Sequence, residues 1–412
     1  MKRDYTMSIL TSMELKNELM QAAQNTPIIL KSLYNGQHSP TNAAEVLLYP
    51  YPERLRLLIL CGSKISESSS DYEVFASACK LMPYLSGTSA YAEMQRDVNL
   101  MLNEDVALNE ENCDLVWKMI ARMLMKDSAD LLSRLNIKKL VASPRFDRIC
   151  NITDALCVPD LTPLVSTSVH KLKKALAVLG SSADLAVTSL ATLENAFANM
   201  IRSVHSQGVN TVSLEIRIDD FRIPNPYSAE QALKTVLFGK SSDVNEEERS
   251  ILRFQILRTV CKILCAEGMR LALRVTSDKS AYNYDSVPTM LEYLNASDLL
   301  PRVNLIISPE MMMHLANTAS FLRPALLTAD LSFRVGYRQV LDTLRSLSAV
   351  LPLSRISAPI LSSMAQISIL REALCRVLTD ATEEGSAPND AATLASVIDA
   401  FCYRNCSDFY SS

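Results

Sequence analysis

Charged residues stand at the ends of several apolar runs, where a parallel α/β fold gathers its functional groups. They are Glu215, Arg217, Asp219, Arg274, Asp330 and Arg355. A carboxylate in such a place can act as a general base, and a guanidinium can polarise a carbonyl or hold an anion. We therefore take Glu215, Arg274 and Asp330 as catalytic candidates, and Arg217 and Arg355 as binding candidates. As a group, these charged residues form either a rebuilt polar site or a salt-bridged plug that fills the same space, and we favour the plug.

Histidine, the commonest general base and metal ligand, occurs only four times in the chain. Three of these residues, His170, His205 and His314, fall inside segments of helical pattern, so we expect them on the surface or in packing contacts. The fourth, His38 in NGQHSP, follows an early apolar run and is a candidate for binding.

Composition argues against several classes of function. A net charge of -4 and a pI of 5.7 leave no basic field for nucleic acid. The sequence has neither G-x-G-x-x-G nor G-x-x-x-x-G-K-[ST], the glycine-rich motifs of dinucleotide and nucleoside-triphosphate sites. Its ten cysteines include no CxxC pair, so we expect reduced, mostly buried thiols. We expect no cofactor.

The chain also has no feature that predicts a membrane protein. No apolar run approaches the roughly 18 residues of a membrane span. The first ten residues, MKRDYTMSIL, include Asp4 and polar residues where a signal peptide has its apolar stretch. We therefore expect a cytoplasmic protein with no membrane partner.

The elements that would position the charged residues alternate between short apolar runs and helical segments. From residue 136 onward, this alternation is typical of parallel βα units. The expected strands are residues 27–30, 137–142, 155–158, 211–218, 270–276, 302–307, 325–328 and 353–356. Eight such units predict a (β/α)8 TIM-type barrel, with functional residues at the C-terminal ends of its strands.

Residues 35–135 break this rhythm and show mostly helical pattern. We interpret them as a helical insertion after the first strand of a single barrel domain spanning residues 1–412, which ends in a helical tail. The length of the chain fits two domains as well.

The tail resembles the C-terminal segment of a known family. Residues 382–410, TEEGSAPNDAATLASVIDAFCYRNCSDFY, match the end of uronate isomerases without a gap at Gly385, Pro388, Asp390, Leu394, Cys402 and Asn405. Upstream, TPIILKSLYN is similar to the family's MPIIDYHCHL, and MPYLSGTSAY to its P-Y-x-x-G-x-x-L-Y. LLSRLNIKKLVAS is similar to its entry into the second strand. The resemblance implies a metal-dependent hydrolase-type barrel that interconverts an aldose uronate and its keto form.

The family's functional residues are not found at the matching positions. Its first strand ends in D-x-H-x-H, whose paired imidazoles hold a divalent metal, whereas this chain has Ser32 and Tyr34 at the two histidines. Arg274 stands at the histidine of the fifth strand. Other replaced positions are Leu30, Cys157, Ile356 and Ala358. The resemblance therefore implies no metal site, and it leaves Ser32 and Tyr34 as binding candidates only.

These departures favour a non-catalytic relative that binds a sugar acid or serves in an oligomer. The alternatives are an active isomerase with a reorganised, metal-free site and a purely structural subunit. We expect a homo-oligomer, because family relatives tend to associate. Alternation along strands 211–218 and 270–276 puts Glu215 and Arg274 on one face. We expect Arg274 to pair with Glu215, with Asp330 as the competing partner.

Overall fold

The structure is a computed structural model, in which the chain forms two compact units. It describes residues 11–31, 40–66, 68–126, 128–148, 155–218, 221, 223, 225–240, 244–276, 285–318, 325–331, 336–361 and 363–411. The first unit comprises Met1–Leu140, Leu331–Ser354 and Ile360–Arg404. The second comprises Val141–Asp330, Arg355–Pro359 and Asn405–Ser412.

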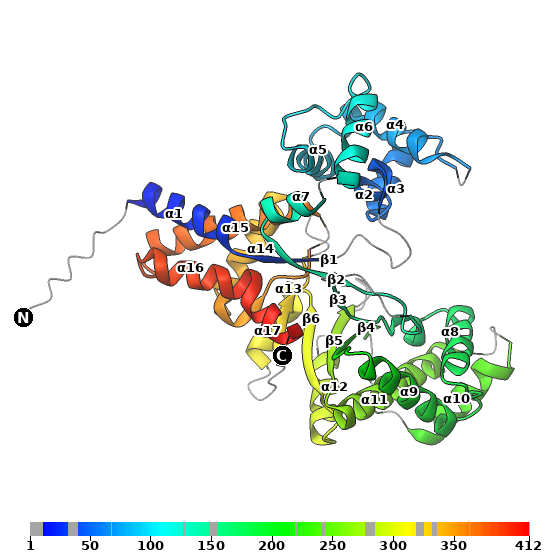
Figure 1. Cartoon of the computed structure of the whole chain (residues 1–412). Coiled ribbons are helices and arrows are strands. Elements are labelled where there is room, and N and C mark those ends of the chain that lie inside the picture. Colours follow the sequence, from blue (N-terminus) through cyan, green and yellow to red (C-terminus); the bar gives the residue numbers. More distant parts are fainter. Residues whose placement is uncertain are drawn as a thin grey trace, which may run out of the picture. The chain divides into compact units, whose positions relative to one another are not determined.

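A parallel five-stranded sheet forms the centre of the second unit (Figure 1). Its strands lie in chain order: β4 (Thr211–Arg217), β5 (Arg270–Thr276), β6 (Arg302–Ile307), β7 (Leu326–Ala329) and β8 (Ile356–Ser357). Leu214 on β4 aligns with Leu273 on β5, and each is at most 1% exposed. Two neighbouring parallel strands cannot be joined by a tight turn and need a crossover connection, which is usually a helix. The parallel pairing therefore explains why helices lie between these strands in the chain.

Three earlier strands form a second sheet, in the order β1-β2-β3. In the first unit, β1 (Ile28–Lys31) and β2 (Ile137–Ala142) are neighbours, and Ile28 N donates to Asn136 O at 3.0 Å. The end of β2 belongs to the second unit, where Val158 N, just after β3 (Ala155–Cys157), donates to Ala142 O at 2.8 Å. The α/β class with parallel strands is confirmed, and closure into a complete barrel stays a prediction.

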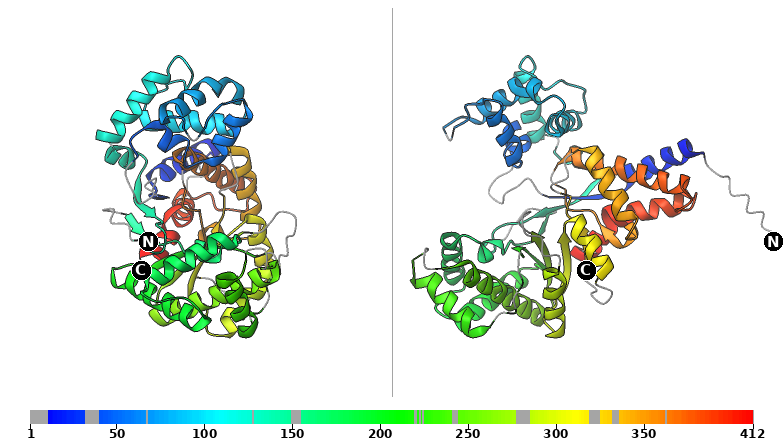
Figure 2. Two further views of the ribbon diagram at one scale, coloured as in Figure 1. Left: turned by 90° about the vertical axis from the view of Figure 1, so that its right-hand side faces the viewer. Right: turned by 180° about the vertical axis from the view of Figure 1, so that it is seen from behind.

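Helices make up the rest of the first unit, including the region expected to be an insertion. They are α1 (Ser12–Asn25), α2 (Ala43–Leu47), α3 (Pro52–Leu60), α4 (Asp71–Leu81), α5 (Ser89–Leu102), α6 (Cys113–Lys126), α7 (Ser128–Arg134), α14 (Tyr337–Ser348), α15 (Met364–Glu383) and α16 (Ala391–Asp399). Capping boxes explain several starts: at α4, for example, Ser70 and Glu73 satisfy each other's backbone N–H groups. Figure 2 shows α1, α15 and α16 side by side, as their contacts require.

The second unit carries the other helices. They are α8 (Val169–Ser182), α9 (Leu190–Ser206), α10 (Pro226–Phe238), α11 (Glu246–Glu267), α12 (Ser286–Ala296), α13 (Pro309–Thr318) and α17 (Asn405–Ser411). Helices α8 to α11 pack on one another (Figure 1). Gly268 ends α11 in the left-handed conformation at φ 66°, which glycine adopts without a steric penalty.

One expected strand was wrong in its bounds. The last strand is shorter and later than expected, because Leu353–Arg355 form a 3-10 turn and only Ile356–Ser357 pair with β7. Upstream, Ser181 and Ser182 end α8, and the side chain of Ser189 caps α9 by accepting from the N–H of Thr192. Among the described residues, no helix is long and apolar enough to cross a membrane.

Candidate functional site

One face of the sheet in the second unit carries polar side chains. On β4, Val212, Leu214 and Ile216 are fully buried, whereas Glu215 between them is exposed. The parallel register aligns Glu215 with Arg274 on β5 and then with Ile306 on β6. Because aligned residues share a face, the expectation that Glu215 and Arg274 lie on one face is confirmed.

Arg274 is ion-paired with Asp330, not with Glu215. Its Nε lies 3.6 Å from Asp330 Oδ2, and the two side chains are 33% and 5% exposed. Asp330 directly follows β7, where its N–H donates to Ile307 O at 2.7 Å. The expected Arg274–Glu215 pair was therefore wrong, because the long Arg274 side chain reaches across β6 to the more buried carboxylate. A buried carboxylate gains more than an exposed one from a neighbouring cation.

The C-terminal helix α17 adds a buried tyrosine to the same face. Burial raises the pKa of Tyr410, and Asn304 and the charge of Arg274 partly offset this shift. Asn304 on β6 also accepts a hydrogen bond from Thr328 Oγ1 at 2.7 Å. No pattern in the sequence indicated that Tyr410 belongs to this group. The one available signal was its place beside Phe409 at the end of the tail.

Backbone contacts hold α17 in this position. Arg270 Nη1 donates to Phe409 O at 2.9 Å, and Asn405 Nδ2 donates to Ile356 O at 2.9 Å. Arg270 and Ile356 are the first residues of β5 and β8. The helix therefore contacts the N-terminal ends of the strands, while Arg274 and Asp330 lie toward their C-terminal ends.

The remaining site candidates divide into three groups. Arg217 is half-buried at the C-terminal end of β4, aligned with Thr276, as expected for a binding candidate. Arg355 is exposed in the turn before β8, so its expected place at the C-terminal ends was wrong. The strand begins at Ile356, three residues later than expected, so Arg355 precedes it at the N-terminal edge of the sheet. Ser32, Tyr34, His38 and Asp219 lie outside the described residues.

The three helical histidines lie off the strands, as expected. His314 on α13 contacts Asp285 at 3.3 Å, and His205 on α9 lies 3.9 Å from Glu267. His170 is exposed on α8. Within the ranges that the structure describes, no group of three or more His, Cys, Asp or Glu residues is arranged to hold a metal ion.

Comparisons with known proteins identify full-length relatives. No family model matches the chain. A uronate isomerase from Bacillus velezensis is 22% identical to it, and the match covers 99% of this chain and 98% of that protein.

Solved structures agree over the same length. A uronate isomerase from Thermotoga maritima matches with a TM-score of 0.81 at 13% identity, covering 98% of each chain. A glucuronate isomerase from Caulobacter crescentus matches with a TM-score of 0.77 at 13% identity, covering 98% of this chain and 95% of that one. A putative metal-dependent hydrolase from Lactobacillus casei has a TM-score of 0.58 at 14% identity, covering 95% and 97%. The α/β fold is that of these structures.

Proposed function

Because the chain belongs to the uronate isomerase family, we propose that it is a member without metal-dependent isomerase activity that binds a sugar acid. The observation that carries this proposal is the ion pair between Arg274 and Asp330. Arg274 stands where the resemblance puts the histidine of the fifth strand. A cationic side chain at that position disfavours a metal cation on the polar face of the sheet and favours an anion there.

Isomerisation of an aldose to a ketose needs two groups. A base must move a proton between neighbouring carbons, and an electrophile must polarise the carbonyl oxygen. In the family, a divalent metal held by histidines is implied at this site. The described residues do not fit such a metal, because a guanidinium has no lone pair to donate and Asp330 already pairs with it.

Charge makes the misfit worse. A divalent cation beside Arg274 would be repelled by roughly 4 kcal/mol per pair of unit charges, at about 4 Å and an effective dielectric constant of about 20. Asp330 would have to give up the ion pair to ligate it. Both effects weaken divalent binding at this position.

The same residues suit an organic anion. Arg217 is the last residue of β4, Arg274 lies two residues before the end of the neighbouring β5, and both side chains are partly accessible. Guanidinium groups match a carboxylate in geometry as well as charge. A uronate brings one carboxylate and several hydroxyls, for which Glu215 is an exposed acceptor on the same face.

Ligand-induced thermal shift tests this proposal. Glucuronate and galacturonate should raise the melting temperature, whereas glucose and galactose, which lack the carboxylate, should not. Arg274→Met should abolish the shift, and Arg355→Met is the matched control because that arginine is exposed at the other edge of the sheet. Equal shifts with acids and neutral sugars, or a shift that survives Arg274→Met, would contradict sugar-acid binding at this site.

The second candidate is a metal-free isomerase, which the alignment of Glu215 with Arg274 favours. Glu215 would be the base and Arg274 the group that polarises the carbonyl. Turnover of a uronate that survives chelator and is lost in Glu215→Gln would support this alternative and replace the first proposal.

We also propose that the chain forms a homo-oligomer. Support comes from α3 of the helical insertion, where Ile59 and Leu60 are 55% and 80% exposed. Sedimentation should give a species heavier than the 45.7 kDa monomer. A clean monomer at micromolar concentration would contradict it.

A further inference from the structure

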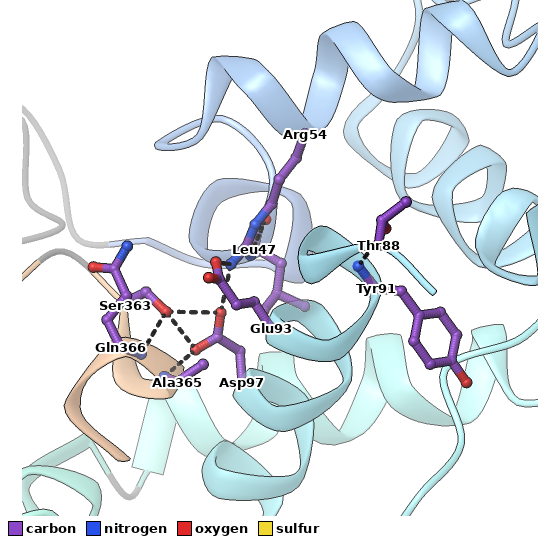
Figure 3. Close-up of polar contacts among 9 residues, drawn as sticks. All are labelled: Leu47, Arg54, Thr88, Tyr91, Glu93, Asp97, Ser363, Ala365 and Gln366. Carbon is purple, nitrogen blue, oxygen red and sulfur yellow. Dashed lines mark hydrogen bonds and ion pairs between the residues drawn. The ribbon is translucent and has the colours of Figure 1, made fainter. Parts of the chain in front are cut away.

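Two carboxylates on α5, Glu93 and Asp97, lie close to Arg54, and Asp97 also contacts the start of α15 (Figure 3). Asp97 accepts hydrogen bonds from Ser363 Oγ at 2.9 Å and from Ala365 N at 2.8 Å. Ser363 is the N-cap of α15, so Asp97 serves N–H and O–H groups at that helix start. The two residues are 266 positions apart in the sequence.

The other carboxylate, Glu93, lies one turn earlier on the same helix face. The backbone N–H of Gly336, the N-cap of α14, is close enough to favour its charged form. The start of α14 also packs tightly on α5, since a Cβ on Gly336 would lie 3.2 Å from Ser89 Cβ. Helix α5 therefore docks against the starts of α14 and α15, with one carboxylate for each.

A single cation serves both carboxylates. Arg54 on α3 is 1% exposed, and its Nη2 lies 2.9 Å from Asp97 Oδ2 but 3.6 Å from Glu93 Oε2. Its other amino group donates to Leu47 O at 2.8 Å, and the guanidinium stacks on the ring of Tyr51 at 3.9 Å. Arg54 therefore compensates the charge of Asp97 more closely than that of Glu93, and its remaining contacts go to Leu47 and Tyr51.

Glu93 is less well compensated than Asp97 by hydrogen bonds and by the charge of Arg54. It is 4% exposed, and its Oε1 has no hydrogen-bond partner among the residues that the structure describes. An ionised carboxylate in this position would be costly, because two negative charges would share one positive charge away from water.

The charged and titratable groups that face Glu93 come from α5, from α3 and from the residue that precedes α3. Asp97 belongs to its own helix, Arg54 comes from α3, and Tyr51 precedes α3. Burial raises the pKa of Tyr51, so this phenol stays neutral. The starts of α14 and α15 contribute Gly336 and Ser363 without side-chain charge.

We propose that Glu93 is a proton-dependent clasp, neutral while α5 is docked on the starts of α14 and α15 and ionised when α5 opens. Burial, the largest cause, raises the pKa of Glu93, and the charge of Asp97 adds to the effect. Docking should then be complete at a pH below the ordinary glutamate value and should weaken as the pH rises through the raised value. The clasp links the helical insertion to helices that follow β7 and β8 in the chain.

Hydrogen exchange on the full-length protein tests the clasp. Protection factors, which remove the intrinsic effect of pH on exchange, should be measured at about pH 5 and about pH 8. In the wild type, α5 and the first turn of α15 should lose protection at the higher pH, by about tenfold for each unit by which the pKa of Glu93 is raised within this window. Glu93→Gln, which copies the neutral acid, should keep the low-pH protection at both values.

Glu111→Gln is the control, because Glu111 is an exposed glutamate of the same helical insertion. This variant should retain the pH dependence of the wild type. An unchanged pH dependence in Glu93→Gln would overturn the proposal. So would a Glu93→Gln protein that fails to fold or is less protected at both values, because a neutral amide should be tolerated.

Discussion

Arg274 and Asp330 form an ion pair on the polar face of the sheet, with Nε of the arginine 3.6 Å from Oδ2 of the aspartate. The two residues lie on or just after strands separated by β6. The pair combines a partly accessible cation with a buried anion. It gives the polar face a fixed positive group where a metal would need neutral or anionic ligands.

Removing the cation should destabilise the protein by a moderate amount. Arg274→Ala leaves the buried Asp330 without this partner, although Asp330 has other interactions. Because Arg274 is itself partly solvated, we expect a loss of about 1 to 2 kcal/mol in the free energy of unfolding. Denaturant unfolding measures it, and Arg355→Ala is the surface control. If both variants unfold at the same denaturant concentration, the pair does not stabilise the fold.

The stability of the protein should depend on pH through Glu93. Its raised pKa means that the folded state holds a proton that the unfolded state releases above the ordinary glutamate pKa. The free energy of unfolding therefore falls as pH rises from that value through the raised one, by about 1.4 kcal/mol per unit of pKa difference. Glu93→Gln should be more stable than the wild type at neutral pH and should lack this part of the pH dependence. Parallel curves for the two proteins would contradict the assignment.

Asp97 should matter more for stability than any surface carboxylate. Asp97→Asn removes the charge that balances the buried Arg54 and weakens the bonds to Ser363 and Ala365. Breaking a buried pair of this kind typically costs about 3 kcal/mol or more. Asp342→Asn, whose carboxylate is 75% exposed beside Arg345, is the control and should change little. A loss below about 1 kcal/mol for Asp97→Asn would argue against its role in docking α5.

The tail should contribute through the hydroxyl of Tyr410. Tyr410→Phe keeps the buried ring and removes the bond to Asn304, so we expect a loss of about 1 kcal/mol. Tyr227→Phe, at a ring that is 75% exposed, provides the comparison. Equal stability of Tyr410→Phe and the wild type would mean that the tail is held by Phe409 and Asn405 alone.

Most of the strands could be predicted because buried parallel strands appear in a sequence as short apolar runs. The run at residues 270–276 is an example, since it coincides with β5. The last strand could not be placed, because its two residues carry no pattern and a 3-10 turn precedes them.

The partners of buried charges are harder to predict than the strands. Alternation puts Glu215 and Arg274 on one face correctly, but it does not say which carboxylate a long side chain will reach. Contacts between distant segments, such as Asp97 with Ser363, leave no local signal at all. Such pairs depend on how whole helices dock, which a single sequence does not encode in any short window.

The most direct measurement of the central claim is an isomerase assay on the purified protein with added zinc or manganese. Glucuronate and galacturonate should yield no keto-uronate above the background of a reaction without protein, because the cation of Arg274 and its pairing with Asp330 exclude a metal from this face. Turnover above that background that a chelator abolishes would contradict the account, and it would show that a metal binds despite the arginine.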